Sequence, residues 1–307
     1  MESVALNVAQ QRVLDELGSV ERPSFEPSLQ AELRAELQDA FTPMATVVTE
    51  DDDLFVSKRA LGMVLSCEQH YVCDRDDEFT WSVPTAQGTV AHKAIELLVG
   101  FRGEPTPLDL IEAALARLEN DRSIGDFLLG LSEAERADLV AGCNDQVAGF
   151  MESFPPLRRQ WRPVTEARVR ASFLGGALQL GGKVDLQLGY ARGQEAGKVI
   201  IDLKTGRVHR THVDDLRFYA LVETLKHGVP PRLLVSYYLD AAAPHTEAVT
   251  EDILWAAAQR TAEGVARLVE LRQPDAKPTR TPSGSCTFCP LNTSCEPGRD
   301  FLKNRDR

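Results

Sequence analysis

The amino-acid sequence predicts an α/β fold in which a mixed central β-sheet is flanked by helices. Between residues 163 and 240, four short stretches alternate apolar and polar side chains as strands do, and one helical stretch interrupts them. On either side, residues 88–155 and 251–273 place apolar side chains at helical spacing. The chain has 307 residues, 43% of them hydrophobic, which is enough for one large domain with a sizeable core.

The start of the chain is predicted to be helical. Residues 1–40 carry apolar side chains at helical spacing, and Pro23 and Pro27 break the pattern. We therefore expect a helical N-terminal extension over residues 1–50 and a main domain over residues 51–307.

The predicted strands follow one another closely in the second half of the chain. They cover residues 166–173, 177–188, 198–203 and 233–239. The helix between the last two strands is expected over residues 213–227. Short strands with a helix among them are typical of a mixed sheet.

Two of these strands end in charged side chains. Residues 199–206 read V-I-I-D-L-K-T-G, and because side chains alternate along a strand, Asp202 and Lys204 share one face while Leu203 points to the other. A hairpin would bring Asp185, near the end of the preceding strand, close to Asp202. Paired carboxylates are costly to bury without a partner, and a divalent cation bound to oxygen is the natural one.

This pattern resembles the PD-(D/E)xK nuclease superfamily, and within it the RecB-type branch. Asp185 matches the first acidic position of the superfamily. Asp202 and Lys204 match its D-x-K, which Thr205 and Gly206 extend to D-x-K-T-G. The resemblance implies a restriction-endonuclease-like core and phosphodiester hydrolysis with Mg²⁺ or Mn²⁺. D-x-K alone would also fit an edge hairpin with an ordinary surface ion pair.

Three positions outside this run extend the resemblance. His92 ends a G-x-x-x-H segment, where the RecB branch has a metal-binding histidine at the start of a helix. Glu166 opens the strand before the first aspartate, where the family often has an acidic residue. Tyr219 matches the family's Q-x-x-x-Y helix over the site, although Asp215 stands in place of Gln.

The resemblance implies a role for each of these residues. The metal ligands would be His92, Asp185, Asp202 and the main-chain carbonyl of Leu203. Lys204 would orient the attacking water and stabilise the oxyanion. Glu166 would position a second metal or a water, and Tyr219 would lie over the site.

Members of this family often degrade single-stranded DNA from its ends. The resemblance therefore implies an exonuclease of DNA repair, recombination or defence that works with a helicase or another repair or defence protein. Two other classes stay open at this point. One is a catalytically silent DNA-binding or assembly subunit with the same fold, and the other is an iron–sulfur DNA-binding sensor.

A cysteine cluster near the end of the chain is a second signal. Cys286, Cys289 and Cys295 form a C-x2-C-x5-C pattern that needs a fourth ligand, for which Cys67 and Cys73 compete. Spacing alone favours a structural Zn²⁺, and an oxidising compartment would allow disulfides instead.

The segment around Cys67 changes this balance. It follows a helix predicted over residues 57–66 and resembles the S-x-L-x-x-x-x-x-C-P opening of AddB-type nucleases and of CRISPR spacer-acquisition nucleases, with Glu68 in place of Pro. There, one upstream cysteine and three C-terminal ones hold a 4Fe–4S cluster. The resemblance implies the same for Cys67 and the C-terminal cysteine loop, whereas Cys143 is expected to be an inert buried thiol.

The charge of the chain limits how it meets DNA. A net charge of −12 argues against a protein that coats DNA non-specifically, but a local basic surface is enough for binding. Basic side chains gather over residues 158–170 and directly after Gly206. No apolar stretch is long enough for a membrane span and no signal-peptide pattern is present, so we expect a reducing, cytoplasmic setting.

Overall fold

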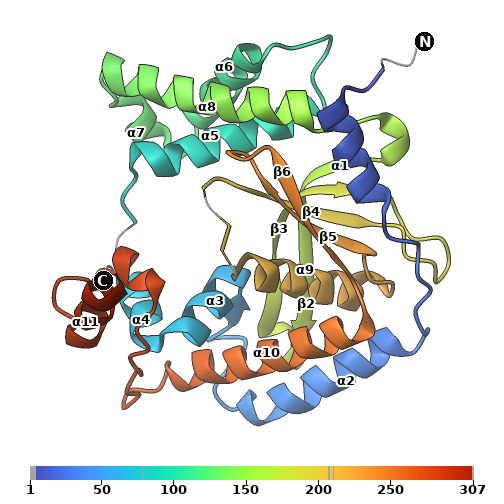
Figure 1. Ribbon diagram of the computed structural model, residues 1–307. Coiled ribbons are helices and arrows are strands. Elements are labelled where there is room, and N and C mark those ends of the chain that lie inside the picture. The colour runs from blue at the N-terminus through green and yellow to red at the C-terminus, as the bar shows by residue number, and fades with distance from the viewer. Residues whose placement is uncertain (1–4, 78, 207, 210, 306–307) are drawn as a thin grey trace.

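The computed structural model describes residues 5–77, 79–206, 208–209 and 211–305 (Figure 1). Its centre is a six-stranded mixed sheet in the order β1-β3-β4-β5-β6, in which β2 also pairs with β3. Helices cover both faces of this sheet. The predicted fold class, a mixed sheet flanked by helices, is therefore confirmed.

Four of the six strands lie where the alternating pattern predicted them. The strands are β1 Leu54–Val56, β2 Val164–Phe173, β3 Leu178–Leu188, β4 Val199–Lys204, β5 Leu233–Tyr238 and β6 Ala243–Ala248. β1 and β6 were not predicted. β1 has only three residues, and β6 is a largely exposed edge strand that lacks a buried apolar row.

Helices dominate both ends of the chain. They are α1 Val8–Gly18, α2 Leu29–Phe41, α3 Lys58–Ser66, α4 Glu68–Asp76, α5 Val83–Leu98, α6 Pro107–Leu118, α7 Gly125–Leu129, α8 Glu133–Ser153, α9 Thr211–His227, α10 Glu251–Glu270 and α11 Glu296–Arg305. Short 3₁₀ turns are η1 Thr42–Met44, η2 Arg159–Trp161, η3 Leu174–Gly176 and η4 Gly284–Phe288. In the described part of the chain, no helix is long and apolar enough to cross a membrane.

The sheet separates two apolar cores. Helices α2, α3, α9 and α10 pack on one face, and α1, α5, α6 and α8 pack on the other, as Figure 1 shows. β4 shows the alternation directly, because Ile200 belongs to the first core while Ile201 and Leu203 belong to the second. Asp202 therefore points to the α9 side, opposite Leu203.

The N-terminal residues contribute to both cores. The inner face of α2 is fully buried and consists of Leu29, Leu33, Leu37 and Phe41. On the other side of the sheet, α1 buries Val13 and Leu17. The division into a 1–50 extension and a 51–307 domain stays a prediction.

The strand pairing opens a gap beside the middle of β3. β2 pairs with β3 along its length, so β1 and β4 share the other edge of β3. β1 is parallel to β3 and β4 is antiparallel, so the carboxyl ends of β1 and β4 point toward each other. The residues that follow β1 and those that end β4 consequently meet at one place.

Candidate active site

Two aspartates come together where β3 and β4 separate. The antiparallel register pairs Leu186 with Ile201, which places Asp185 next to Asp202 on the neighbouring strand. The main-chain N–H of Leu203 donates a hydrogen bond of 2.7 Å to Asp185 Oδ2. Asp202 is almost fully buried, with 1% of its surface exposed. The hairpin prediction thus correctly brought the two carboxylates together.

Two ammonium groups hold the buried Asp202. Lys204 Nζ lies 2.6 Å from Asp202 Oδ2, and Lys58 Nζ lies 2.6 Å from Asp202 Oδ1. Burial raises the pKa of the Asp202 carboxyl, but the two lysines outweigh it and the pKa is lowered. Asp202 is therefore ionised at neutral pH and balanced by two positive charges.

Lys58 is the residue of this group that the sequence analysis missed. It is the first residue of α3, directly after β1, and Ser57 caps this helix by accepting a hydrogen bond from the N–H of Ala60. The facing ends of β1 and β4 bring Lys58 to Asp202, 144 residues further along the chain. The only signal in the sequence is a lysine at a helix start after a very short strand.

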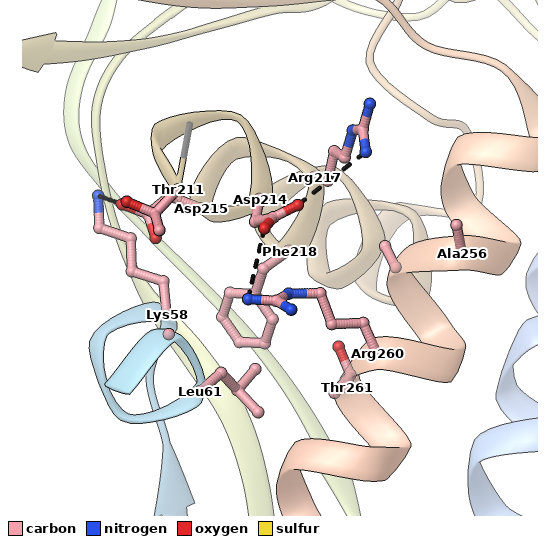
Figure 2. A pocket seen from close by; sticks show the side chains of 12 residues that line it. Lys58, Leu61, Thr211, Asp214, Asp215, Arg217, Phe218, Ala256, Arg260 and Thr261 are labelled. Atoms are coloured by element: carbon pink, nitrogen blue, oxygen red, sulfur yellow. Dashed lines mark ion pairs between the residues drawn. The ribbon is translucent and has the colours of Figure 1, made fainter. Parts of the chain in front are cut away.

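α9 contributes a third carboxylate. Asp215 Oδ2 lies 3.2 Å from Lys204 Nζ and 3.9 Å from Lys58 Nζ. Figure 2 shows the Lys58 side chain extended toward Asp215 at one end of a pocket between α3, α9 and α10. An acidic residue at this position, where the family pattern has Gln, offsets the charge of the second lysine.

Tyr219 lies one turn further along α9. Its hydroxyl donates a hydrogen bond of 2.7 Å to the carbonyl of Lys183, and Lys58 Nζ lies 4.9 Å from the centre of its ring. The ring packs on Gly182, where an added Cβ would lie only 2.9 Å from it. Burial raises the pKa of Tyr219, so its hydroxyl stays protonated.

His92 reaches the site from the opposite face of the sheet. Its Nδ1 lies 3.7 Å from Asp185 Oδ2. Burial lowers the pKa of His92, but the charges of Asp185 and Asp202 outweigh it and the pKa is raised. The expected position at a helix start is wrong, because α5 begins at Val83 and the residue lies within the helix.

Glu166 lies near this group but faces elsewhere. In the β2–β3 register it falls opposite Asp185, and its positive φ of 51° interrupts the regular strand. Its carboxylate forms an ion pair with the exposed Lys183. Among the described residues it forms no ion pair with His92 or Lys204, so the structure gives no contact that supports its predicted role.

The basic segment after Gly206 borders the site in part. His212 Nδ1 lies 2.9 Å from the hydroxyl of Tyr238, and burial, together with the charge of Lys204, lowers the pKa of His212 to about 4. The imidazole is therefore neutral at pH 7. Arg207 and Arg210 lie outside the described residues.

The three C-terminal cysteines and Cys67 line one small cavity of about 20 Å³. Thr281 N–H donates to Cys67 Sγ at 3.4 Å, and Ser283 N–H donates to Cys286 Sγ at 3.4 Å. Burial is the main cause of the raised pKa of Cys289. Electrostatic interaction with Cys73, Cys67 and Cys286 raises this pKa further, so the four thiols lie near one another. All six cysteines of the chain are free thiols.

Cys143 differs from these thiols. It is fully buried and donates to the carbonyl of Gln87 at 3.6 Å, and burial raises its pKa to about 12. Its expected character as a buried thiol is confirmed. Because only the thiolate is reactive and this thiol stays protonated at neutral pH, Cys143 is inert.

Neither the carboxylates nor the cysteines form a finished metal site. In the part of the chain that the structure describes, no three His, Cys, Asp or Glu side chains are arranged to hold a metal ion. One atom nevertheless lacks a fitting partner. Asp202 Oδ2 is buried and accepts no hydrogen bond of good geometry, although the Lys204 ammonium is close.

Comparison with protein families decides the assignment. A family model described as the PD-(D/E)XK nuclease superfamily matches residues 56–296, which is most of the chain. The chain belongs to the PD-(D/E)XK nuclease superfamily. The match begins at the end of β1 and ends at the start of α11, so it contains both aspartates, both lysines and all the cysteines. The RecB and AddB branches are not distinguished by this match.

Solved structures with a related shape are distant in sequence. A crystal structure of a candidate exonuclease from Eubacterium rectale is 12% identical, with a TM-score of 0.46 over 80% of this chain and 87% of that chain. The crystal structure of SSO0001 is 15% identical, with a TM-score of 0.32 over 70% of this chain and 97% of that chain. The chain matches none of the curated proteins with which it was compared.

Proposed function

We propose that this PD-(D/E)XK protein is a metal-dependent deoxyribonuclease that hydrolyses phosphodiester bonds in DNA. The observation that carries the proposal is the meeting of Asp185, Asp202 and Lys204 at the ends of β3 and β4, with His92 beside them. A buried carboxylate with a second, partly exposed carboxylate and lysines beside it suits a cation and a phosphate better than it suits fold stability alone.

The donor set fits a hard divalent cation. Carboxylate and carbonyl oxygens suit Mg²⁺ or Mn²⁺, and an imidazole is compatible with Mn²⁺. The ligands we propose are His92, Asp185, Asp202 and the carbonyl of Leu203. Such a cation lowers the pKa of a bound water and offsets charge on a phosphate.

The two lysines have distinct roles in this proposal. Lys204 orients the attacking water and stabilises the negative charge that develops on the phosphate. Lys58 holds Asp202 while no cation is bound and moves to Asp215 when one binds. Tyr219 positions Lys58 by packing beneath its ammonium, and Glu166 positions a water or a second cation only if it leaves Lys183.

We propose single-stranded DNA ends as the preferred substrate, hence an exonuclease of repair, recombination or defence. The family's frequent action on such ends supports this choice, and a helicase or another repair or defence protein would supply the strand. The nuclease domain covers residues 51–307, and residues 1–50 form its N-terminal extension.

We also propose that Cys67, Cys286, Cys289 and Cys295 hold a 4Fe–4S cluster in the reducing cytoplasm. The proposal is supported by the four thiols that line one cavity and by the main-chain N–H groups that donate to two of their sulfurs. Gly298 supports the cavity wall, since a Cβ there would lie 3.3 Å from Cys286 Sγ. A structural Zn²⁺ on the same thiols is the competing occupant.

The substrate is tested with linear and circular DNA. Purified protein with Mn²⁺ is incubated with end-labelled linear single strands, linear duplexes and circular single strands. We expect linear single strands to be degraded fastest and circles to persist. Rapid cutting of circles would contradict the exonuclease, and metal-dependent DNA binding without any cleavage would identify a silent assembly subunit instead.

A further inference from the structure

A second cavity, of about 270 Å³, lies at the far end of the β3–β4 hairpin. Leu188 and Val199, the last residue of β3 and the first of β4, form part of its wall. The position of Leu188, three residues beyond Asp185, places the cavity about 10 Å further along the strand. The end of α1 and the turn η2 close its sides.

The cavity is basic in an acidic protein. Three arginines line it, namely Arg22, Arg192 and Arg232. None of the described residues that line the cavity is acidic. At the rim, Arg22 pairs with Glu195 at 3.6 Å, and Arg162 adds a further positive charge over Tyr190. Three guanidinium groups thus line the cavity and a fourth lies over Tyr190, in a chain whose net charge is −12. Such a local excess attracts anions.

Arg232 fixes this charge in place. Its two terminal nitrogens donate to the carbonyls of Leu17 and Val20 at 2.6 and 2.9 Å, at the end of α1. Its Nε is buried and has no hydrogen-bond partner. Burial and the nearby charge of Arg22 lower the pKa of Arg232, and the partners of its terminal nitrogens are neutral carbonyls rather than a carboxylate.

An aromatic side chain stands at the mouth of the cavity. Tyr190 is 38% exposed, and the guanidinium groups of Arg162 and Arg192 lie 4.0 and 5.7 Å from its ring centre. The loop beneath it is tightly packed, since a Cβ on Gly197 would lie 2.1 Å from the carbonyl of Tyr190. Trp161 forms a second aromatic wall. The Tyr190 ring is therefore held in place before a ligand binds.

We infer that this cavity binds a nucleotide of the DNA strand, with its phosphate on the arginines and its base against Tyr190 and Trp161. Arginine forks recognise phosphate oxygens, and aromatic faces stack on any base, which is how single strands are bound without sequence preference. The inference rests on the proposed function for the class of its ligand. A free mononucleotide shares this chemistry and is separated from a strand by the experiment.

The test is binding by the full-length protein without metal, so that no DNA is cut. A fluorescent oligothymidylate is titrated against wild type, Tyr190→Ala and Arg192→Glu, and fluorescence anisotropy is followed. We expect each variant to bind about tenfold more weakly, because Tyr190→Ala removes a face on which a base stacks and Arg192→Glu removes a positive charge that meets a phosphate. For Arg192→Glu, the slope of log affinity against log salt should also fall by about 1. Arg122→Glu, an exposed charge reversal between α6 and α7, is the matched control and should bind as wild type does.

Thymidine monophosphate separates the two sources of nucleotide. Thymidine monophosphate is titrated against the protein while tryptophan fluorescence is followed. If it quenches the fluorescence, and both Trp161→Phe and Tyr190→Ala abolish this quenching, the free nucleotide also binds in the cavity. If the variants weaken binding of the oligonucleotide and thymidine monophosphate causes no such quenching, the cavity binds the strand alone. If Tyr190→Ala and Arg192→Glu bind both probes as wild type does, the inference is wrong. Asp202→Asn tests the proposed function separately, since it should lose cleavage and retain binding to this cavity.

Discussion

Asp202 is the residue on which the site depends. It is buried and touched at both oxygens by ammonium groups, from Lys58 on one side and Lys204 on the other. A buried carboxylate without such partners would be too costly to ionise. A cation can reach Asp202 only if one lysine withdraws, and the pocket beside Lys58 in Figure 2 leaves room for it to turn to Asp215.

This arrangement predicts competition between Lys58 and the metal. In Lys58→Met the cation no longer has to displace an ammonium, so we expect Mn²⁺ to bind about tenfold more tightly, which corresponds to about 1.4 kcal/mol. Titration calorimetry on metal-free protein measures the affinity. Lys277→Met, which removes an exposed lysine between α10 and η4, should leave it unchanged. Weaker Mn²⁺ binding in Lys58→Met would show that Lys58 supports the ligands instead.

His92 should behave as one metal ligand among several. In His92→Ala we expect cleavage to fall about 10–100-fold, with partial recovery at high Mn²⁺, because losing one contact lowers affinity without removing the site. Cleavage rates across a range of Mn²⁺ concentrations measure this. A rate that equals wild type at every concentration would place His92 outside the ligand set.

At this scale, short motifs in the sequence located most of the site. Asp202 and Lys204 are two residues apart, and the strand period alone places them on one face. Lys58 could not be found this way, because its approach depends on how β1 and β4 face each other across β3. The role of Glu166 stays a prediction, since its positive φ and its ion pair with Lys183 are features that the sequence pattern did not indicate.

The elements matter because strand ends and helix starts converge. β4 was predicted from its β-branched run and β3 from the alternation of its side chains, and their pairing follows from a hairpin. β1 was not predicted, because a strand of three residues is too short to show an alternation of apolar and polar side chains. The helical region was predicted from residue 88, whereas α5 begins at Val83, with Pro84 in its first turn, where proline is favoured.

The contact between β3 and α9 gives a test of packing. Gly182 leaves room for the Tyr219 ring, so we expect Gly182→Ala to lower the free energy of unfolding by about 1–3 kcal/mol through overpacking. Urea denaturation measures the change. Gly62→Ala is the control, since nothing lies within 4 Å of a Cβ there and alanine in the helix α3 should stabilise by about 0.5–1 kcal/mol. Equal effects in both variants would argue against a close β3–α9 contact.

On the scale of the whole molecule, the segment around Cys67 meets the C-terminal segment at the cysteines. Cys67 follows α3, the other three thiols lie in and after η4 and before α11, and all four line one cavity. A group bound there closes a loop of more than two hundred residues, which constrains the unfolded chain. The basic cavity is likewise a product of the fold, because Arg22, Arg192 and Arg232 are far apart in sequence.

The cysteine proposal predicts a coloured protein. After anaerobic purification we expect about four irons per chain and a broad visible absorbance, as a four-cysteine cubane requires. Cys286→Ser should remove the colour and lower the melting temperature, whereas Cys143→Ser should leave the colour unchanged. Colourless protein with one zinc per chain would replace iron–sulfur by zinc, and loss of colour in Cys73→Ser but not in Cys67→Ser would move the fourth ligand.

The most direct test of the central claim is the rate of Mn²⁺-dependent cleavage of linear single-stranded DNA under single-turnover conditions. The rate is compared among wild type, Asp202→Asn and Lys204→Ala, with circular dichroism to show that each variant is folded. We predict metal-dependent cleavage by wild type and a loss of at least about 10²-fold in each variant, because each removes a group that acts on the reacting phosphate or its water. Wild-type cleavage by either folded variant would contradict the claim that this group of residues carries the activity.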